Sequence, residues 1–162
     1  MRFGILTISD RSSRGERADT SGPALVEVIN ARGWQIVKSD IIPDELDIIS
    51  KNLIAWVDSG ELDVLLTTGG TGFAPRDVTP EATRLVVERL TPGLDEAMRA
   101  HSLQITPHAM LSRAVSGIRK QTLIINLPGS PRAAVECLEV FLPVMQHAVE
   151  TLRGETNECA RK

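Results

Sequence analysis

Short apolar runs alternate along this chain with segments of helix length, and this alternation limits the possible folds more than any other feature. The runs cover residues 2–8, 34–42, 64–68 and 122–127. Apolar residues at helical spacing occupy most of the intervals between them, and connections of that kind join parallel strands. The sequence therefore predicts an α/β domain with a largely parallel sheet.

The segments between the runs carry the start and stop signals of helices. Hydroxyl or acidic caps, or a proline in the first turn, precede them, and Gly33 follows the first one. The last predicted helix contains Pro143, which should kink it or split it in two. Residues 113–118 and 122–127 are predicted to be two short strands joined by a basic turn. Helices are expected to start near residues 20, 44, 80, 92 and 131, the third of them reaching Leu90.

Composition narrows the class of protein. The chain has 162 residues, which is long enough to bury one core of ordinary size. Hydrophobic residues make up 42% and charged residues 24%, as is typical of a globular domain. A net charge of −3 and an aromatic content of 3% argue against a nucleic-acid partner, which usually meets a basic stripe or stacking aromatics. We expect one domain over residues 1–153 and a disordered polar tail over residues 154–162.

Cysteine usage and the N-terminus indicate where the protein works. Cys137 and Cys159 form no CxxC pair, so we expect free thiols, as in a reducing cytosol. The N-terminal apolar run ends before Asp10, which makes it too short for a signal peptide or a membrane span. We therefore expect a cytoplasmic protein that has no membrane partner.

Three polar segments should meet at one edge of the predicted sheet. Residues 9–11 follow the first strand, residues 67–77 follow the third, and residues 127–131 follow the last. Ligands collect beyond the carboxyl ends of the strands in open α/β sheets. Exposed backbone N–H groups and the positive ends of helices favour anions at such places. A phosphate or a phosphorylated ligand is the natural candidate.

Local patterns alone leave the roles of these segments open. The stretch Gly69-Gly70-Thr71-Gly72 matches neither the dinucleotide-binding pattern nor a P-loop, and it suits a tight structural turn as well as a phosphate contact. Asp44 and Asp77 could simply favour the first turns of the helices that follow them. The three histidines lack metal-ligand spacing, and no Ser-His-Asp set emerges.

Five motifs, taken in order, resemble the molybdopterin adenylyltransferase family of molybdenum-cofactor biosynthesis. That family includes a bacterial enzyme and the corresponding domains of plant and animal proteins, gephyrin among them. The resemblance extends over roughly residues 2–153, and five ordered motifs are far more specific than any one of them. They are Ile8-Ser9-Asp10-Arg11, Ile42-Pro43-Asp44-Glu45, Thr67-Thr68-Gly69-Gly70-Thr71-Gly72, Arg76-Asp77-Val78-Thr79-Pro80-Glu81-Ala82-Thr83 and Leu127-Pro128-Gly129-Ser130-Pro131.

The resemblance implies a three-layer α/β/α sandwich, a homotrimer and a Mg²⁺-dependent transfer of AMP from ATP to the terminal phosphate of molybdopterin. Acids matching Asp44 and Asp77 are the ones needed for activity in that family, and both are present here. Because Mg²⁺ takes hard oxygen ligands, these two acids are also the metal candidates. The residues expected to bind the ligands are Ser9, Asp10, Thr68, Gly69, Gly70, Thr71, Gly72, Arg76, Pro128, Gly129 and Ser130.

The resemblance leaves one alternative of a different class, a non-catalytic trimer that binds molybdopterin or acts as a scaffold. Retention of both Asp44 and Asp77 favours the enzyme. An attacking phosphate monoester has a second pKa of about 6 and needs no strong general base, which fits the lack of a histidine dyad. A molybdate-inserting enzyme is the expected downstream partner.

Overall fold

The computed structural model describes residues 1–155 and contains a six-stranded sheet with the order β2-β1-β3-β6-β5-β4. Strands β1, β2, β3 and β6 run parallel to one another, whereas β4 and β5 are antiparallel to their neighbours. The predicted α/β class with a mostly parallel sheet is confirmed. The strands are β1 (Arg2–Ile8), β2 (Gln35–Ile42), β3 (Val64–Thr68), β4 (Arg89–Leu90), β5 (Ser116–Arg119) and β6 (Thr122–Leu127).

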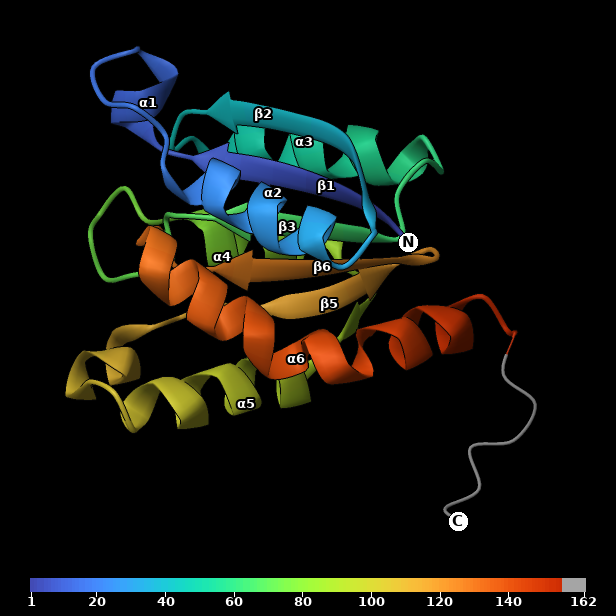
Figure 1. Cartoon of the computed structure of the whole chain (residues 1–162). Coiled ribbons are helices and arrows are strands. Elements are labelled where there is room, and N and C mark those ends of the chain that lie inside the picture. Colours follow the sequence, from blue (N-terminus) through green and yellow to red (C-terminus); the bar gives the residue numbers. More distant parts are fainter. Residues whose placement is uncertain (156–162) are drawn as a thin grey trace.

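Helices cover both faces of the sheet and give the three-layer sandwich (Figure 1). Helices α2, α5 and α6 contribute to the core on one face, and α3 and α4 contribute to the core on the other. The helices are α1 (Asp10–Ser13), α2 (Ser21–Ala31), α3 (Leu46–Asp58), α4 (Thr79–Val86), α5 (Pro92–Leu103), the 3₁₀ helix η1 (Pro107–Leu111) and α6 (Pro131–Leu152).

The strands form the middle layer because their side chains alternate between the two cores. In β1, Phe3 and Ile5 point into the core shared with α2 and α6, where Phe3 stacks on Trp34 with ring centroids 5.3 Å apart. Leu6 and Ile8 of the same strand point into the core shared with α3 and α4. A strand that is apolar on both faces belongs in the interior of a parallel sheet.

The register brings the ends of the central strands to one level. Thr7 of β1 lies opposite Thr68 of β3, which lies opposite Leu127 of β6. The segments that follow these strands therefore meet at the carboxyl edge of the sheet. They form the left side of the molecule in Figure 1.

Two predicted boundaries were wrong. Leu90 is not part of the third predicted helix, because α4 ends at Val86 and residues 88–91 hydrogen-bond to β5 as an edge strand. Residues 113–115 precede β5 instead of belonging to it, since Arg113 donates its backbone N–H to the glycine-rich loop. Pro143 does not split α6, which is continuous, but the helix changes direction along its length (Figure 1). The Pro143 ring is exposed, and a proline within a helix is a usual cause of such a bend.

Within residues 1–155, no helix is both long enough and apolar enough to cross a membrane. Gly154 and Glu155 follow α6, and most of the predicted tail, Cys159 included, lies outside the described residues. The other cysteine, Cys137, is a free thiol buried in α6.

Candidate functional site: a polar cleft at the carboxyl edge of the sheet

A polar cleft of about 420 Å³ opens where β1, β3 and β6 end. Its walls are the segment from β1 to α2, the turn after β2, the loop after β3 and the start of α6. The loop after β3, residues 69–78, is called the glycine loop below. Eight of the residues predicted to form the site line this cleft, and they are Ser9, Asp44, Thr68, Gly69, Gly70, Asp77, Gly129 and Ser130.

Asp44 does not cap the helix that follows it. The α3 helix begins at Leu46, and the Asp44 carboxylate instead accepts the backbone N–H of Asp10, with Asp10 N and Asp44 Oδ2 2.7 Å apart. In return, the backbone N–H of Asp44 donates to Asp10 Oδ1 at 3.1 Å. This pair of bonds joins the turn after β2 to the first turn of α1, and it holds Asp44 at the cleft wall.

Arg76 completes this arrangement from the glycine loop. Its guanidinium donates to both oxygens of Asp10, at 3.0 and 2.9 Å, and to Glu45 Oε1 at 2.7 Å. Hydrogen bonding to Arg76 is the main reason that the pKa of the Asp10 carboxyl lies below its ordinary value of 3.8. Arg76 thus ties the glycine loop to the Asp10–Asp44 pair, and its side chain does not line the cleft itself.

Burial raises the pKa of the Asp44 carboxyl above its ordinary value of 3.8. The negative charges of Asp10 and Asp77 act in the same direction. The hydrogen bond from Asp10 N–H and the positive charge of Arg76 act against them. A half-buried carboxylate beside another acid is a place where a cation is favoured.

Asp77 also has no role as a helix cap. Helix α4 begins at Thr79, whereas Asp77 Oδ2 accepts the backbone N–H of Ala74 at 2.9 Å within the glycine loop. A Cβ atom on Gly72 would lie 2.8 Å from Asp77 Oδ2, so the carboxylate occupies space that only a glycine leaves free. The glycine-rich sequence therefore makes room for the acid that follows it.

The start of the glycine loop approaches its neighbours too closely for side chains. Gly69 and Gly70 have positive φ angles of 107° and 62°, and a Cβ on Gly69 would overlap the carbonyl oxygen of Ile8. A Cβ on Gly129 would lie 3.2 Å from Gly69 Cα. Thr79 fixes the turn, because its hydroxyl donates to Gly69 O at 2.9 Å and its N–H donates to Gly70 O at 3.1 Å. The cleft floor is therefore bare backbone.

Two of the helices that begin at the cleft, α2 and α6, differ in whether the N–H groups at their starts have acceptors. The start of α2 is already capped, since Asp19 Oδ1 accepts the N–H groups of Ser21 and Gly22 at 3.0 and 3.1 Å. At α6, Ser130 makes no side-chain cap, and its N–H has no acceptor within residues 1–155. The N–H of Gly70 in the glycine loop has no acceptor within these residues either. These groups can receive an anion.

The cleft can hold a hard cation, although it does not form a full metal cage. In the described part of the chain, no group of three or more His, Cys, Asp or Glu side chains is arranged around a common point. Asp44 and Asp77 each use Oδ2 for a backbone N–H, and their Oδ1 atoms accept no hydrogen bond from residues 1–155. Two carboxylate oxygens, with waters and ligand phosphates completing the shell, fit the usual coordination of Mg²⁺.

The other five predicted site residues lie around this cleft. Asp10 and Arg76 support it as described. Thr71, Gly72 and Pro128 line a neighbouring, mostly apolar crevice of about 260 Å³ between the glycine loop, α5, η1 and α6. The glycine loop therefore separates a polar cleft from an apolar one.

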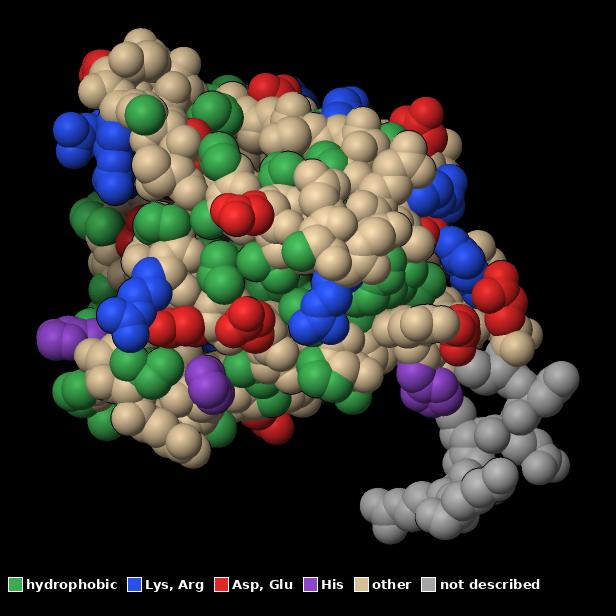
Figure 2. Space-filling model, viewed as in Figure 1, with side chains coloured by type: hydrophobic (Ala, Val, Ile, Leu, Met, Phe, Trp, Pro, Cys, Tyr) green, Lys and Arg blue, Asp and Glu red, His purple; other side chains and the backbone are tan. Residues whose placement is uncertain are grey.

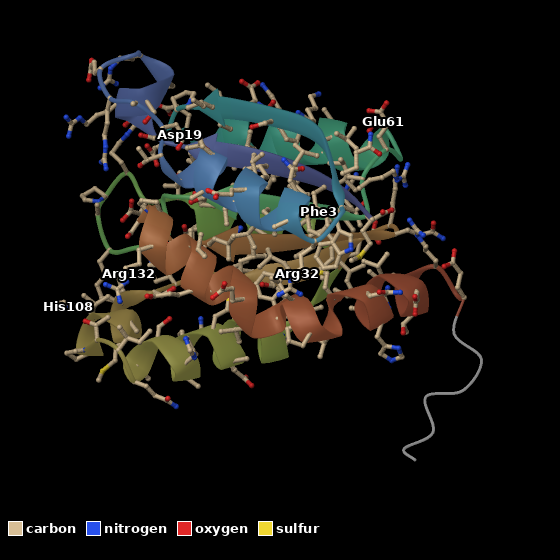
Figure 3. The ribbon with its side chains drawn as sticks, viewed as in Figure 1. Phe3, Asp19, Arg32, Glu61, His108 and Arg132 are labelled. Atoms are coloured by element: carbon tan, nitrogen blue, oxygen red, sulfur yellow. The ribbon has the colours of Figure 1, made fainter. Side chains whose placement is uncertain are left out.

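Sequence reasoning missed one wall of the cleft. Arg17, Asp19, Thr20 and Ser21 line it, although the pattern at residues 19–23 was interpreted only as a helix start. Figure 3 shows Asp19 at the carboxyl end of the sheet, above the start of α6. The signal was available, because this helix follows the first strand. A helix that follows a strand of a parallel sheet starts near the carboxyl edge of that sheet.

Fold and cleft together define an α/β domain with a polar cleft at the carboxyl edge of a mostly parallel sheet. The chain belongs to the family described as a probable molybdopterin binding domain, which matches residues 4–147. The resemblance inferred from the five motifs is confirmed.

The chain is 44% identical over 156 residues to a molybdopterin adenylyltransferase of Helicobacter pylori, covering 95% of this chain and 89% of that protein. It is 46% identical to the molybdenum cofactor synthesis protein cinnamon of Drosophila melanogaster, with 99% of this chain covered, but it spans only 27% of that protein. A crystal structure of the molybdopterin biosynthesis enzyme MoaB from Thermus thermophilus superimposes with a TM-score of 0.89 at 51% identity. The superposition covers 94% of this chain and 96% of that one.

Proposed function

We propose that this protein is a molybdopterin adenylyltransferase, which transfers AMP from ATP to the terminal phosphate of molybdopterin and releases pyrophosphate. One observation carries the proposal: two acids line a polar cleft with a bare glycine floor, in a chain of the molybdopterin-binding family. The name of the Helicobacter pylori relative, most of which this chain spans, supports the same activity.

The reaction joins two anions, and this decides what the cleft must supply. An oxygen of the terminal phosphate forms a bond to the α-phosphorus of ATP, and the bond from that phosphorus to the oxygen bridging to the β-phosphate breaks. The attacking monoester is largely dianionic near neutral pH, so no side chain has to remove a proton from it. Catalysis then rests on alignment and on neutralising charge.

Backbone and cationic groups of this chain meet those needs. The open N–H groups of Gly70 and Ser130, together with the positive end of α6, can bind phosphate oxygens. Arg17 lines the cleft and forms no ion pair within residues 1–155, whereas Arg76 is held by Asp10 and Glu45. We therefore assign phosphate binding to Arg17 and loop support to Arg76.

Asp44 and Asp77 would hold Mg²⁺ through their Oδ1 atoms. When bound, Mg²⁺ neutralises phosphate charge and helps to align the α-phosphate for in-line attack. The reciprocal bonds with Asp10 orient Asp44, and the turn at Ala74 orients Asp77. The chain itself thus fixes both acids before any ligand arrives.

The proposal includes a homotrimer that works in the cytoplasm and passes its product to a molybdate-inserting enzyme. Exposed apolar side chains at the end of α5 and in η1 suit burial against another subunit, and Figure 2 shows hydrophobic side chains around this part of the surface. They are Leu103, Ile105, Met110 and Leu111. Light scattering that gives the mass of a single chain would reject the trimer.

The test is incubation of the purified protein with molybdopterin, ATP and Mg²⁺, followed by detection of adenylylated molybdopterin and pyrophosphate in equal amounts. The variant Asp77→Asn is the matched control, because its amide oxygen can still accept the Ala74 N–H while its charge is gone. We expect product from the native protein and almost none from the variant. Binding of molybdopterin without product would instead favour the scaffold.

A further inference from the structure

Arg113 contacts the glycine loop at both of its ends. Its backbone N–H donates to Thr71 O at 2.9 Å, and Nε donates to Gly72 O at 2.7 Å. Its Nη2 donates to Asp77 O, and its Nη1 pairs with the Glu81 carboxylate in α4. One half-buried side chain therefore joins the beginning of the loop, its end and the helix beyond it.

The middle of the glycine loop has few other supports. Within the described residues, the hydrogen bonds of residues 71–77 to the rest of the protein come from Arg113 and from the Arg76 side chain. The Arg76 guanidinium is half exposed, and ion pairs of that kind contribute little to stability. Arg113 instead donates to backbone carbonyl groups, which have no other partner in the loop.

We propose that Arg113 is a positioning residue that holds the glycine loop so that the Asp77 carboxylate faces the cleft. The inference rests on the proposed function, in which Asp77 acts on the ligands. Arg113 lies outside the lining of the polar cleft, so it acts through the loop and not on the ligand. The planar guanidinium is required, because its fixed fork serves three acceptors at once whereas a lysine ammonium cannot.

The variants Arg113→Ala and Arg113→Lys test this, with Arg119→Ala as the control. Arg119 makes a comparable set of bonds, to both oxygens of Asp58 at 3.0 Å and to Val86 O at 3.2 Å, but at the opposite edge of the sheet. We expect kcat to fall about 10- to 100-fold in Arg113→Ala, the range that follows from a misplaced group. Arg113→Lys should be intermediate, and Arg119→Ala should stay within about twofold of native kcat.

Two further readouts separate positioning from simple loss of stability. Guanidinium ion added at millimolar concentration should restore part of the kcat of Arg113→Ala and none of that of Asp77→Asn. Amide hydrogen exchange at residues 71–77 should speed up in Arg113→Ala and not in Arg119→Ala. Native kcat in Arg113→Ala, or unchanged exchange in the loop, would overturn the proposal.

The same experiments distinguish failure of the proposed function from failure of the inference about Arg113. If the native protein forms no adenylylated molybdopterin, the proposed activity is wrong. Hydrogen exchange then still decides whether Arg113 holds the glycine loop. If Arg113→Ala does not fold, Arg113→Lys carries the measurement, because its ammonium keeps the charge but not the fork. A lysine variant with native kcat and native exchange would then overturn the inference.

Discussion

Asp10 and Asp44 each accept the backbone N–H of the other, across 34 positions of sequence. This reciprocal pair links the segment after β1 to the turn after β2, and Arg76 attaches the glycine loop to it. The Asp10 carboxylate thereby joins three segments of the cleft. Asp10 is thus a structural support for Asp44, although the sequence pointed to it only as a ligand-binding residue.

The first prediction follows from that pair. Asp10→Asn keeps an acceptor for the Asp44 N–H and loses an exposed ion pair, so it should lower the free energy of unfolding by less than about 1 kcal/mol. Asp10→Ala loses both and should cost about 1–2 kcal/mol. Activity should fall more in the alanine variant, because the backbone N–H of Asp44 loses its acceptor and only the bond from the N–H of residue 10 still orients Asp44. Denaturant unfolding and initial rates measure the two effects, and equal behaviour of the two variants would contradict this role.

The second prediction concerns pH and Asp44. Because burial raises the pKa of Asp44 in the folded state above its ordinary 3.8, the native protein holds that proton more tightly than the unfolded chain. This group therefore lowers stability as pH rises from about 3.8 through the raised folded value, and the loss persists at neutral pH. Asp44→Asn cannot lose a proton, and its amide oxygen can still accept the Asp10 N–H.

Asp44→Asn should therefore melt at a higher temperature than the native protein at pH 7 while losing most of its activity. The gain should shrink as pH falls below about 4. Calorimetry at a series of pH values from about 3 to about 8 tests this. A lower melting temperature for Asp44→Asn at pH 7 would show that the charge of Asp44 stabilises the fold.

The third prediction concerns backbone contact at the cleft floor. Gly69→Ala forces an alanine to φ 107° and drives its methyl group into the Ile8 carbonyl, so it should cost roughly 3 kcal/mol or more. Gly93→Ala, at the start of α5, meets nothing within 4 Å and should be neutral or slightly stabilising. Thermal unfolding of the pair distinguishes a required glycine from a tolerated one.

The fourth prediction concerns the proposed phosphate-binding role of Arg17. Arg17→Ala should weaken binding of a non-hydrolysable ATP analogue about tenfold, or roughly 1.4 kcal/mol, and reduce its dependence on salt. Arg14→Ala is the control, because Arg14 lies in the same segment but pairs with Glu16. Titration calorimetry gives the dissociation constant of the ATP analogue for each variant. Equal losses in the two variants would mean that only the net charge of the segment matters.

The strands and the acids of this site could be predicted from sequence, whereas their connections could not. The apolar run of residues 2–8 is visible in the sequence, because it depends only on neighbouring positions. The bond between Asp10 and Asp44 depends on the register of β1 and β2, which no local pattern specifies. Arg113 gave no signal for the same reason. Its side chain donates to backbone carbonyls about 40 positions away, and every residue has a backbone carbonyl, so the sequence does not indicate which ones accept.

The central position of β6 has a consequence for synthesis of the protein. On the ribosome, β1, β2 and β3 emerge well before residues 122–127, so β3 presents an unpaired edge until β6 arrives beside it. The Leu127 carbonyl that receives Gly69 N–H, and the Gly129 turn against Gly69, are made only then. The cleft of a nascent chain therefore stays incomplete until translation has passed the start of α6.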